Sequence, residues 1–457
     1  MKNIIDITND ILTINTVDIN IINFKNINFM PKFNPSIIHL YDNKYLISYR
    51  IWIDKYIENI NEYPNPNSIG SPWFSNWEPF IKKEFSNYDI IKKESKTSSI
   101  EENIEEKLNL NFFGLVIIEI FENKNYNIIH DQIIKLNFSF IEDGRLFIDS
   151  NNIIRILLNA SLNITNSFII YSGIPENKIS RGIICCKIGN IDKIKNDILN
   201  YGKIFVNKPY IICPEVYQYK IEKNFIPFIS NDNSDYISSF SLPFGTPIKK
   251  CKINSYDNNQ LELTNYHYSI VHSENEIIEE NVKLFDEINL IYGGILRFSS
   301  GTNFITFENE NLAVGHLVID IKKFKKNMNN KLYFNQEFLK KNYHYSNIHV
   351  LNINYNIKKL FLKSENYNYN EKIYMMYFYT TSKNYPYNIT KISHAFMPNN
   401  LKSNICFPTG ISWFNENIII SYGDSDNSCC LYFINKKEIY NKLMDININP
   451  CELLLDY

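Results

Sequence analysis

The chain has 457 residues, of which 44% are hydrophobic and 15% aromatic, so it can bury a large core and is not globally disordered. Its 47 basic and 49 acidic residues give a formal net charge of −2 at pH 7, which excludes a global basic field for binding nucleic acid or an anionic membrane. Asn or a charged residue interrupts every Ile-rich stretch, so we expect no membrane span, no signal peptide and a cytoplasmic protein.

Glycine and arginine are scarce, with 14 glycines and five arginines in the whole chain. Ile, Asn, Lys, Tyr and Phe dominate instead, as expected for a protein from an A+T-rich genome such as that of a virus or a parasite. This bias concerns ancestry and not mechanism. It nevertheless draws attention to each remaining glycine and arginine, because special backbone shape and bidentate charge are hard to supply with other residues.

Short strands dominate the predicted structure, because Ile, Val, Tyr and Phe cluster in runs of about four to eight residues between Asn, Asp, Gly or Pro. In chain order, the clearest runs are 36–41, 44–50, 115–121, 145–148, 303–307, 312–319, 373–380 and 417–422. Helical periodicity is limited to 192–199, 277–287 and 322–341. The charged stretches near 92–107 and 322–345 read as surface insertions.

A loose repeat runs through the chain, in which a polar signature is followed by paired hydrophobic strands. The signatures begin near residues 34, 142, 222, 293 and 406. Radial repetition of antiparallel sheets fits this repeat if insertions lengthen the usual blade of about 45 residues. We therefore predict an all-β fold, a five-bladed β-propeller with short helical and loop insertions. No Pro/Ser-rich linker divides the chain, so we expect a single domain over 1–457, with its motifs within about 30–435.

The first two signatures combine turn residues with charged ones. Asn34 precedes a proline and a strand, and Arg50 ends the hairpin partner of that strand. Asn34 either caps the turn or, with Arg50, faces a polar ligand at a propeller axis. The second signature places Glu142, Asp143 and Arg145 within four residues. Along a regular strand, Asp143 and Arg145 share one face and Glu142 takes the other. The group is either a buried structural ion pair or an acid beside a cation in a cleft, suited to general acid catalysis.

The third and fifth signatures supply further polar groups. Lys223 and Asn224 either contact a phosphate or sugar hydroxyl or serve only as turn residues. Asp424 and Asp426 follow a buried-looking strand, where they could hold sugar hydroxyls or a cation. Their spacing lacks the pattern of a calcium-binding loop, so we expect no metal.

The fourth signature is the longest and is rich in small residues. Gly293-Gly294 leads to Arg297 and Ser300, and glycines, hydroxyls and an arginine together are typical of an anion-binding loop. His316 follows a glycine in an apolar strand. Such a histidine is either a satisfied core residue or a phosphate contact.

In chain order, these signatures resemble those of the five-bladed propellers of the glycosidase-like superfamily, and within it the β-mannoside phosphorylases and β-1,2-mannosyltransferases. The resemblance rests on Asn34-Pro35-Ser36, Tyr49-Arg50, Glu142-Asp143-x-Arg145-Leu146, Glu222-Lys223-Asn224, Gly293-Gly294, Gly315-His316 and Ser421-Tyr422-Gly423-x-x-Asp426. It implies a sugar-binding funnel at the propeller axis.

The resemblance also implies roles for individual residues. Asp143 matches the acid that protonates the glycosidic oxygen, and in phosphorylases of this kind phosphate replaces the second carboxylate as nucleophile. The implied sugar-binding residues are Asn34, Arg50, Glu142, Arg145, Lys223, Asn224 and Asp426, and the implied phosphate-binding residues are Arg297, Ser300 and His316. No cofactor or metal is implied. The co-substrate would be inorganic phosphate, a sugar phosphate or a nucleotide sugar, and the partner a sugar or glycan.

Two departures from the family pattern leave alternatives open. Gly144 stands where family members usually have proline, and 297–301 replaces the usual Gly-rich phosphate segment. A transferase that uses a sugar phosphate or nucleotide sugar therefore fits as well as a phosphorylase. We expect a carbohydrate-active enzyme of one of these two kinds, acting on mannose-like sugars. The alternatives are a non-catalytic glycan-binding propeller and a propeller scaffold that binds protein partners through its insertions.

Overall fold

The computed structural model describes residues 4–7, 32–51, 112–136, 141–161, 181–207, 209–211, 225–229, 235–239, 249–252, 296–320, 372–383, 389–398, 405–424 and 428–445. The predicted helices at 277–287 and 322–341 lie outside these residues, as do the insertions near 92–107 and 322–345. All eight predicted strand runs overlap described strands, and the predicted helix 192–199 lies within a described helix.

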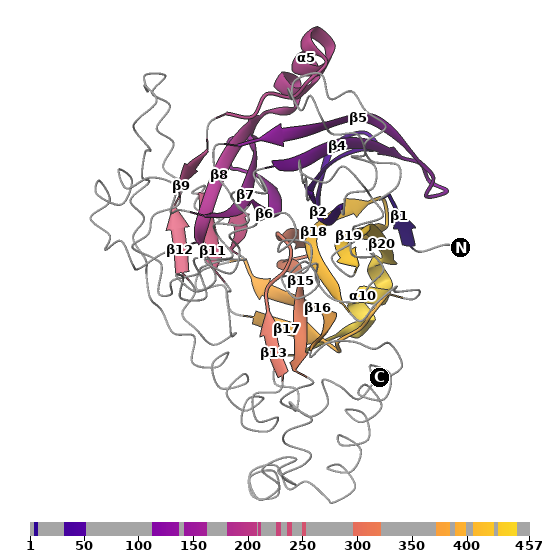
Figure 1. Cartoon of the computed structure of the whole chain (residues 1–457). Coiled ribbons are helices and arrows are strands. Elements are labelled where there is room, and N and C mark those ends of the chain that lie inside the picture. The colour runs from indigo at the N-terminus through magenta and orange to yellow at the C-terminus, as the bar shows by residue number, and fades with distance from the viewer. Residues whose placement is uncertain are drawn as a thin grey trace, which may run out of the picture.

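Antiparallel strands form five sheets that are arranged around a common centre (Figure 1). Sheet 1 contains β2 (Lys32–Tyr41), β3 (Lys44–Ile51), β4 (Phe112–Ile120) and β5 (Tyr126–Lys135). Sheet 2 contains β6 (Glu142–Ile148), β7 (Ile154–Ser161), β8 (Arg181–Gly189) and β9 (Tyr210–Ile211). Sheet 3 contains β10 (Ile226–Ile229), β11 (Asp235–Ser239) and β12 (Lys249–Lys252).

The remaining two sheets come from the C-terminal part of the chain and its first strand. Sheet 4 contains β13 (Leu296–Ser299), β14 (Ile305–Phe307), β15 (Glu310–Asp320), β16 (Lys372–Ser382), β17 (Ile389–Ser393) and β21 (Leu443–Asp445). Sheet 5 contains β18 (Cys406–Phe414), β19 (Asn417–Asp424), β20 (Ser428–Asn435) and β1 (Ile4–Asp6). Because β1 pairs with β20, the N-terminal strand completes the last sheet and closes the arrangement.

Sheets 1, 2, 4 and 5 each have four or more strands and form complete blades, whereas sheet 3 has three described strands. The predicted all-β propeller arrangement is therefore confirmed, but the described residues form four complete blades and not the expected five. The residues that follow β12, 253–295, lie outside the described part of the chain.

Helices are few in the described part of the chain. They are α5 (Ile191–Tyr201), which projects from the rim of sheet 2, and α10 (Lys436–Lys442), which follows β20. Neither described helix has the length and apolar character needed to cross a bilayer.

The cores lie between neighbouring blades, because successive residues of an inner strand point to opposite sides. Ile37 in β2 packs with Phe414 and Ile419 of sheet 5, whereas the next residue, Ile38, packs with residues of sheet 2 such as Leu146. Both faces of β2 are thus buried. This is why the apolar residues Ile37 and Ile38 stand next to each other and do not alternate with polar ones.

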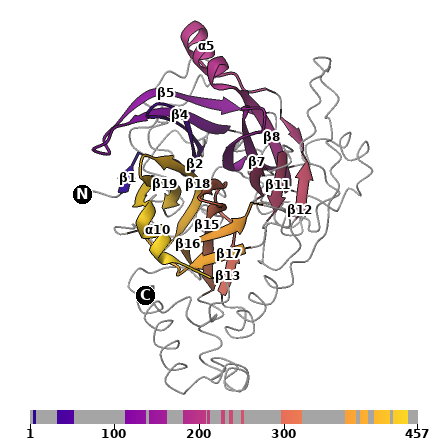
Figure 2. The same ribbon diagram turned by 180° about the vertical axis from the view of Figure 1, so that it is seen from behind.

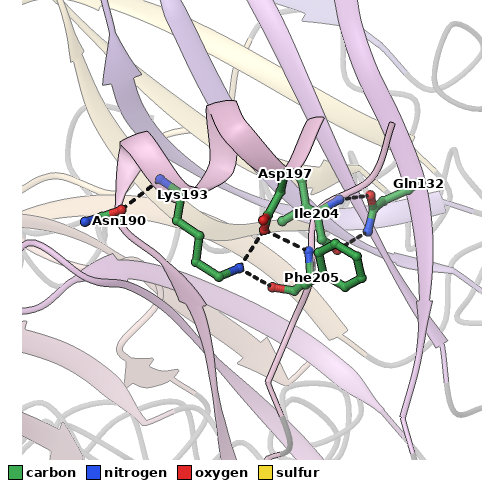
Figure 3. Close-up of polar contacts among 6 residues, drawn as sticks. All are labelled: Gln132, Asn190, Lys193, Asp197, Ile204 and Phe205. Carbon is green, nitrogen blue, oxygen red and sulfur yellow. Dashed lines mark hydrogen bonds and ion pairs between the residues drawn. The ribbon is translucent and has the colours of Figure 1, made fainter. Parts of the chain in front are cut away.

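Gln132 of β5 joins sheet 1 to the segment that follows α5 (Figure 3). Its Nε2 donates to the carbonyl of Ile204 at 2.8 Å, and the Ile204 N–H donates to Oε1 at 2.7 Å. Next to this pair, Asp197 of α5 accepts from Lys193 Nζ at 2.5 Å and from the Phe205 N–H at 3.4 Å. A side-chain amide therefore pairs with the backbone across two blades much as a neighbouring strand would.

We expect Gln132→Ala to lower the free energy of unfolding by about 1–3 kcal/mol, because the buried backbone of Ile204 loses both partners. Urea unfolding measures this loss. Gln132→Glu keeps an acceptor for the Ile204 N–H but offers no donor to its carbonyl, so its stability should fall between the two. Equal stability of Gln132→Ala and the wild type would contradict the role given to this contact.

Five tyrosines between or near the blades stay protonated to unusually high pH because burial disfavours the phenolate. Burial raises the pKa of Tyr45 to about 12, and it also raises the pKa values of Tyr49, Tyr377, Tyr379 and Tyr422. A raised folded-state pKa contributes stability that is present below the unfolded value of 10.0 and is lost as pH rises through the folded value.

We therefore expect alkaline unfolding that begins near pH 10, with stability falling by up to about 1.4 kcal/mol per pH unit for each such tyrosine. Arg145 acts in the opposite direction, since its pKa is lowered. It is outnumbered, because burial raises the pKa values not only of these five tyrosines but also of Tyr432, Cys186, Cys406 and Cys429. Tyrosinate absorbance and circular dichroism, followed against pH, should change together. Ionisation of all the tyrosines around pH 10 with the fold intact would contradict the expectation.

Candidate functional site

The inner strands β2 and β18 lie near the centre of the propeller (Figure 2), and the first strand of each complete blade is interrupted. The interruptions are register shifts in β2 between Phe33 and Ser36, in β6 between Glu142 and Arg145, and in β18 between Pro408 and Gly410, and a break at 300–304 between β13 and β14. Bulges of this kind re-aim side chains and are common beside active sites. Four of the five polar signatures of the sequence fall at these interruptions, and the third, near residue 222, lies outside the described residues.

Side chains at the interruptions bind neighbouring blades to one another. The Thr409 hydroxyl donates to the carbonyl of Pro35 and so links β18 to β2. Asn34 Nδ2 donates to Asp143 Oδ1 at 2.7 Å and links β2 to β6. Sheets 5, 1 and 2 are thus joined through buried hydrogen bonds at the places where their inner strands bulge.

The connection continues through sheet 4. Arg145 Nε donates to the carbonyl of Gly301 at 2.7 Å, which links β6 to the break between β13 and β14. The carboxamide of Asn303 accepts from the Ile411 N–H at 3.1 Å and donates to the Ile411 carbonyl at 3.4 Å, which returns the connection to β18. Four blades therefore form a closed ring of hydrogen bonds around the centre.

Asp143 occupies this ring with a left-handed backbone, at φ 45°, and its partner Asn34 has φ 51°. Such a conformation costs of order 1–3 kcal/mol for most residues, and Asn and Asp tolerate it best. Asp143 is buried, with its side chain at 8% exposure. The strained backbone is thus held by the contacts around it, and it directs the carboxylate toward sheet 1.

Arg50 brings two carboxylates together. Its guanidinium lies 2.9 Å from Glu142 Oε1 and 3.8 Å from Asp143 Oδ1, and all three side chains are buried. The expectation that Glu142 and Asp143 occupy opposite faces of a strand is therefore wrong. The bulge between Glu142 and Arg145 breaks the alternation, so both acids meet the same cation.

Arg145 is buried at 1% exposure, and it donates to the carbonyls of Gly301 and, at 3.2 Å, Asp143. Burial lowers the pKa of Arg145 to about 10, while the nearby Asp143 and Tyr379 act in the opposite direction. The guanidinium remains charged at neutral pH. It therefore supplies a fixed positive charge beside the carboxylate of Asp143.

The three predicted phosphate-binding residues have different environments. Ser300 is fully buried in the break between β13 and β14. His316, in β15, is also buried, and its ring lies 4.7 Å from that of Phe407 and 5.9 Å from that of Tyr374, centroid to centroid. Arg297 is exposed between two buried residues of β13, so it does not share the buried environment of the other two.

Lys223, Asn224 and Asp426 lie outside the described residues. The structure does place Asp424 in β19 at 2% exposure, facing the side of sheet 5 that holds Cys406. Of the predicted site residues, it brings together Asn34, Arg50, Glu142, Asp143 and Arg145.

Several residues of the ring had no role assigned from the sequence. Gly301 and Thr409 stand within the fourth and fifth signatures but were given no role, because the carbonyl of Gly301 is a backbone acceptor and Thr409, like Asn303, binds a backbone atom of another blade. Tyr379 of β16 lies near Arg145, and only its place in an apolar strand run was visible. The glycines at 301 and 423 were the available signal, because glycine is rare in this chain.

Gly144, which departs from the family pattern, has a local explanation. A Cβ added there would lie 2.8 Å from Ile156 Cδ1 and 2.9 Å from Leu158 Cδ2. The position packs against β7, so the glycine serves the contact between β6 and β7. Its carbonyl accepts from the Ser48 hydroxyl at 3.2 Å.

The arrangement supplies one carboxyl group held in a single orientation. Both contacts to the Asp143 carboxylate, from Asn34 and from Arg50, reach Oδ1, and no group in the described segments hydrogen-bonds Oδ2. A carboxyl fixed in this way is prepared for proton transfer through its other oxygen. Within the described residues, no group of three or more His, Cys, Asp or Glu side chains is placed to hold a metal ion.

Fold and site together define an antiparallel β-propeller with a buried acidic and basic cluster at its centre. No protein-family model matches the chain, and no curated protein matches its sequence. Among solved structures, it is similar to MPT-4, a mannose phosphorylase from Leishmania mexicana in complex with phosphate ion, with 11% identity, TM-score 0.41, and coverage of 93% of this chain and 91% of that chain.

Two further similar structures are the following. MPT-1, a GDP-Man-dependent mannosyltransferase from Leishmania mexicana, is 11% identical, with TM-score 0.39 and coverage of 90% and 87%. A glycosyl hydrolase from Bacteroides ovatus is 9% identical, with TM-score 0.42 and coverage of 90% and 86%. Similarity at this level assigns neither a residue role nor a substrate to this chain.

Proposed function

We propose that this chain is a carbohydrate-active enzyme, a glycosyltransferase or glycoside phosphorylase for mannose-like sugars, with Asp143 as its general acid/base. The observation that carries the proposal is the setting of Asp143, which combines a left-handed backbone, burial, and a carboxylate held through Oδ1 by Asn34 and Arg50. Such strain and preorganisation are typical of a catalytic group.

In this proposal, one set of residues around Asp143 binds the sugar and another set binds phosphate. Arg50, Glu142 and Arg145 bind the sugar hydroxyls at the centre of the propeller, together with Lys223, Asn224 and Asp426. Ser300 and His316 bind inorganic phosphate, or the phosphate of a sugar phosphate or nucleotide sugar, because a doubly charged anion needs cationic or hydroxyl donors. Arg297, which is exposed on β13, is left out of this group. Inverting transfer needs one positioned acid/base and one nucleophile, so no cofactor or metal is part of the proposal.

The family resemblance of the motifs supports the choice of mannose-like sugars, since Asn34-Pro35-Ser36 and Glu142-Asp143-x-Arg145 are among the motifs that carry it.

We also propose that sheet 3 belongs to a fifth blade. It is antiparallel like the other four sheets, and it lies between sheets 2 and 4 in chain order. A crystal structure of the chain tests this count.

The test of the function is an assay of the purified full chain with three reactions. These are transfer from mannose 1-phosphate to mannose and mannosides, transfer from a nucleotide mannose to the same acceptors, and phosphorolysis of β-mannosides by inorganic phosphate. Product from any one of them that depends on Asp143 supports the proposal. Binding on a glycan array without product would identify a non-catalytic glycan-binding propeller. The absence of both binding and product would overturn the proposal.

A further inference from the structure

Gly423 of β19 lies directly against the side chain of Asn34. A Cβ added at Gly423 would be 2.0 Å from Asn34 Oδ1, 2.9 Å from its backbone N and 3.1 Å from its Cγ. The backbone at 423 does not have the positive φ that favours glycine, which among the described glycines is found at Gly189 and Gly202. The glycine at 423 is therefore explained by the space that Asn34 occupies.

The carboxamide of Asn34 connects this contact to Asp143. Its Nδ2 donates to Asp143 Oδ1 at 2.7 Å, while its Oδ1 is buried and has no hydrogen-bond partner in the described segments. An amide that is hydrogen-bonded at both its oxygen and its nitrogen would not need a packing contact to fix its orientation. Here the oxygen end is held by packing against Gly423, and the nitrogen end is held by the carboxylate.

We infer that Gly423 is a positioning residue for Asp143, which acts from sheet 5 through Asn34 of sheet 1. This inference rests on the proposed function of Asp143 as the acid/base. It changes the expectation for Asn34, whose amide orients the acid and is not itself a sugar contact. A methyl group at 423 must move the carboxamide oxygen from 2.0 Å to an ordinary contact of 3.4 Å or more, and the hydrogen bond to Asp143 then lengthens or breaks.

A misplacement of about 1 Å near a reacting group can lower a rate by about 100-fold. We expect Gly423→Ala to lower kcat by about 10–100-fold with KM changed by less than about 3-fold, because the acid is displaced and the sugar contacts remain. In an Asn34→Gly background, which accepts the left-handed backbone without strain, the contact with the carboxamide is gone and only the approach to the backbone N at 2.9 Å remains. Adding Gly423→Ala should there lower kcat by no more than about 3-fold.

Gly189→Ala is the matched control. The added methyl group again meets a side chain, with Lys193 Cδ at 2.5 Å, and the positive φ of 137° adds strain. The site lies at the start of α5, away from the ring, so we expect a loss of stability with kcat unchanged. A fall in kcat for Gly423→Ala that is equal with and without Asn34, or no fall at all, would overturn the inference.

A second measurement does not depend on turnover. Urea unfolding of Asn34→Gly, Asp143→Asn and the double variant gives the coupling between the two side chains. We expect a clear coupling when Gly423 is present and none when the same cycle is built on Gly423→Ala. An unchanged coupling overturns the inference even for an inactive protein. If the wild type shows no turnover but Gly423→Ala abolishes the coupling, the proposed enzymatic function fails. The inference that Gly423 positions Asn34 against Asp143 then still holds.

Discussion

Replacing Asp143 by asparagine is expected to lower the rate of sugar transfer or phosphorolysis by about 10²–10⁴-fold, the usual contribution of a general acid/base. Asparagine has the same shape, tolerates the left-handed backbone, and can still accept from Asn34 through its Oδ1. It cannot carry the proton that the reaction transfers. The loss should therefore appear in kcat, with the fold unchanged by circular dichroism.

Asp149→Asn provides the control for Asp143→Asn. Asp149 is also buried, and it accepts from the Asn151 and Ile153 N–H groups and from Arg155 Nε at the turn after β6. We expect this substitution to cost stability but to leave the rate of the folded protein unchanged. Normal activity of Asp143→Asn, or an equal loss in both variants, would remove Asp143 from the role of acid/base.

The sequence predicted the strands well for a physical reason. In a propeller both faces of an inner strand are buried between blades, so β15 and β19 contain short apolar runs, Leu312–Val314 and Ile418–Ile420, that do not alternate with polar residues. The helix at 192–199 was equally visible, because its polar and apolar residues follow the helical period. The number of complete blades could not be predicted in this way, because sequence repeats do not show how many strands each unit contributes.

The site was predicted less completely, because its geometry depends on departures from regular strands. A strand of strict alternation would separate Glu142 from Asp143, and the bulge instead turns both toward Arg50. The sequence did contain one signal of these departures. In both Asn34-Pro35 and Asp143-Gly144, a residue that tolerates positive φ is followed by a turn-forming residue. The backbone acceptors that complete the ring, such as the carbonyl of Gly301, have no signature in sequence.

Gly301→Ala is expected to lower the free energy of unfolding by about 3 kcal/mol, the upper part of the usual range for overpacking. The added Cβ would lie 2.6 Å from the Val314 carbonyl oxygen and 2.8 Å from that of Pro408, and both are backbone atoms of strands that cannot rotate away. Sheets 4 and 5 would have to separate, and the Gly301 carbonyl would move away from Arg145.

Gly144→Ala is the matched control for Gly301→Ala, because its added Cβ meets side-chain ends of Ile156 and Leu158 at similar distances. Those ends can rotate, so we expect a loss of less than about 1.5 kcal/mol. Urea unfolding of both variants measures the difference. Equal losses would mean that the 300–304 segment is free to move and that the ring through Arg145 does not hold the blades. A larger loss at Gly301 means that the ring which orients Asp143 also joins four blades, so the geometry of the site and the stability of the fold depend on the same hydrogen bonds.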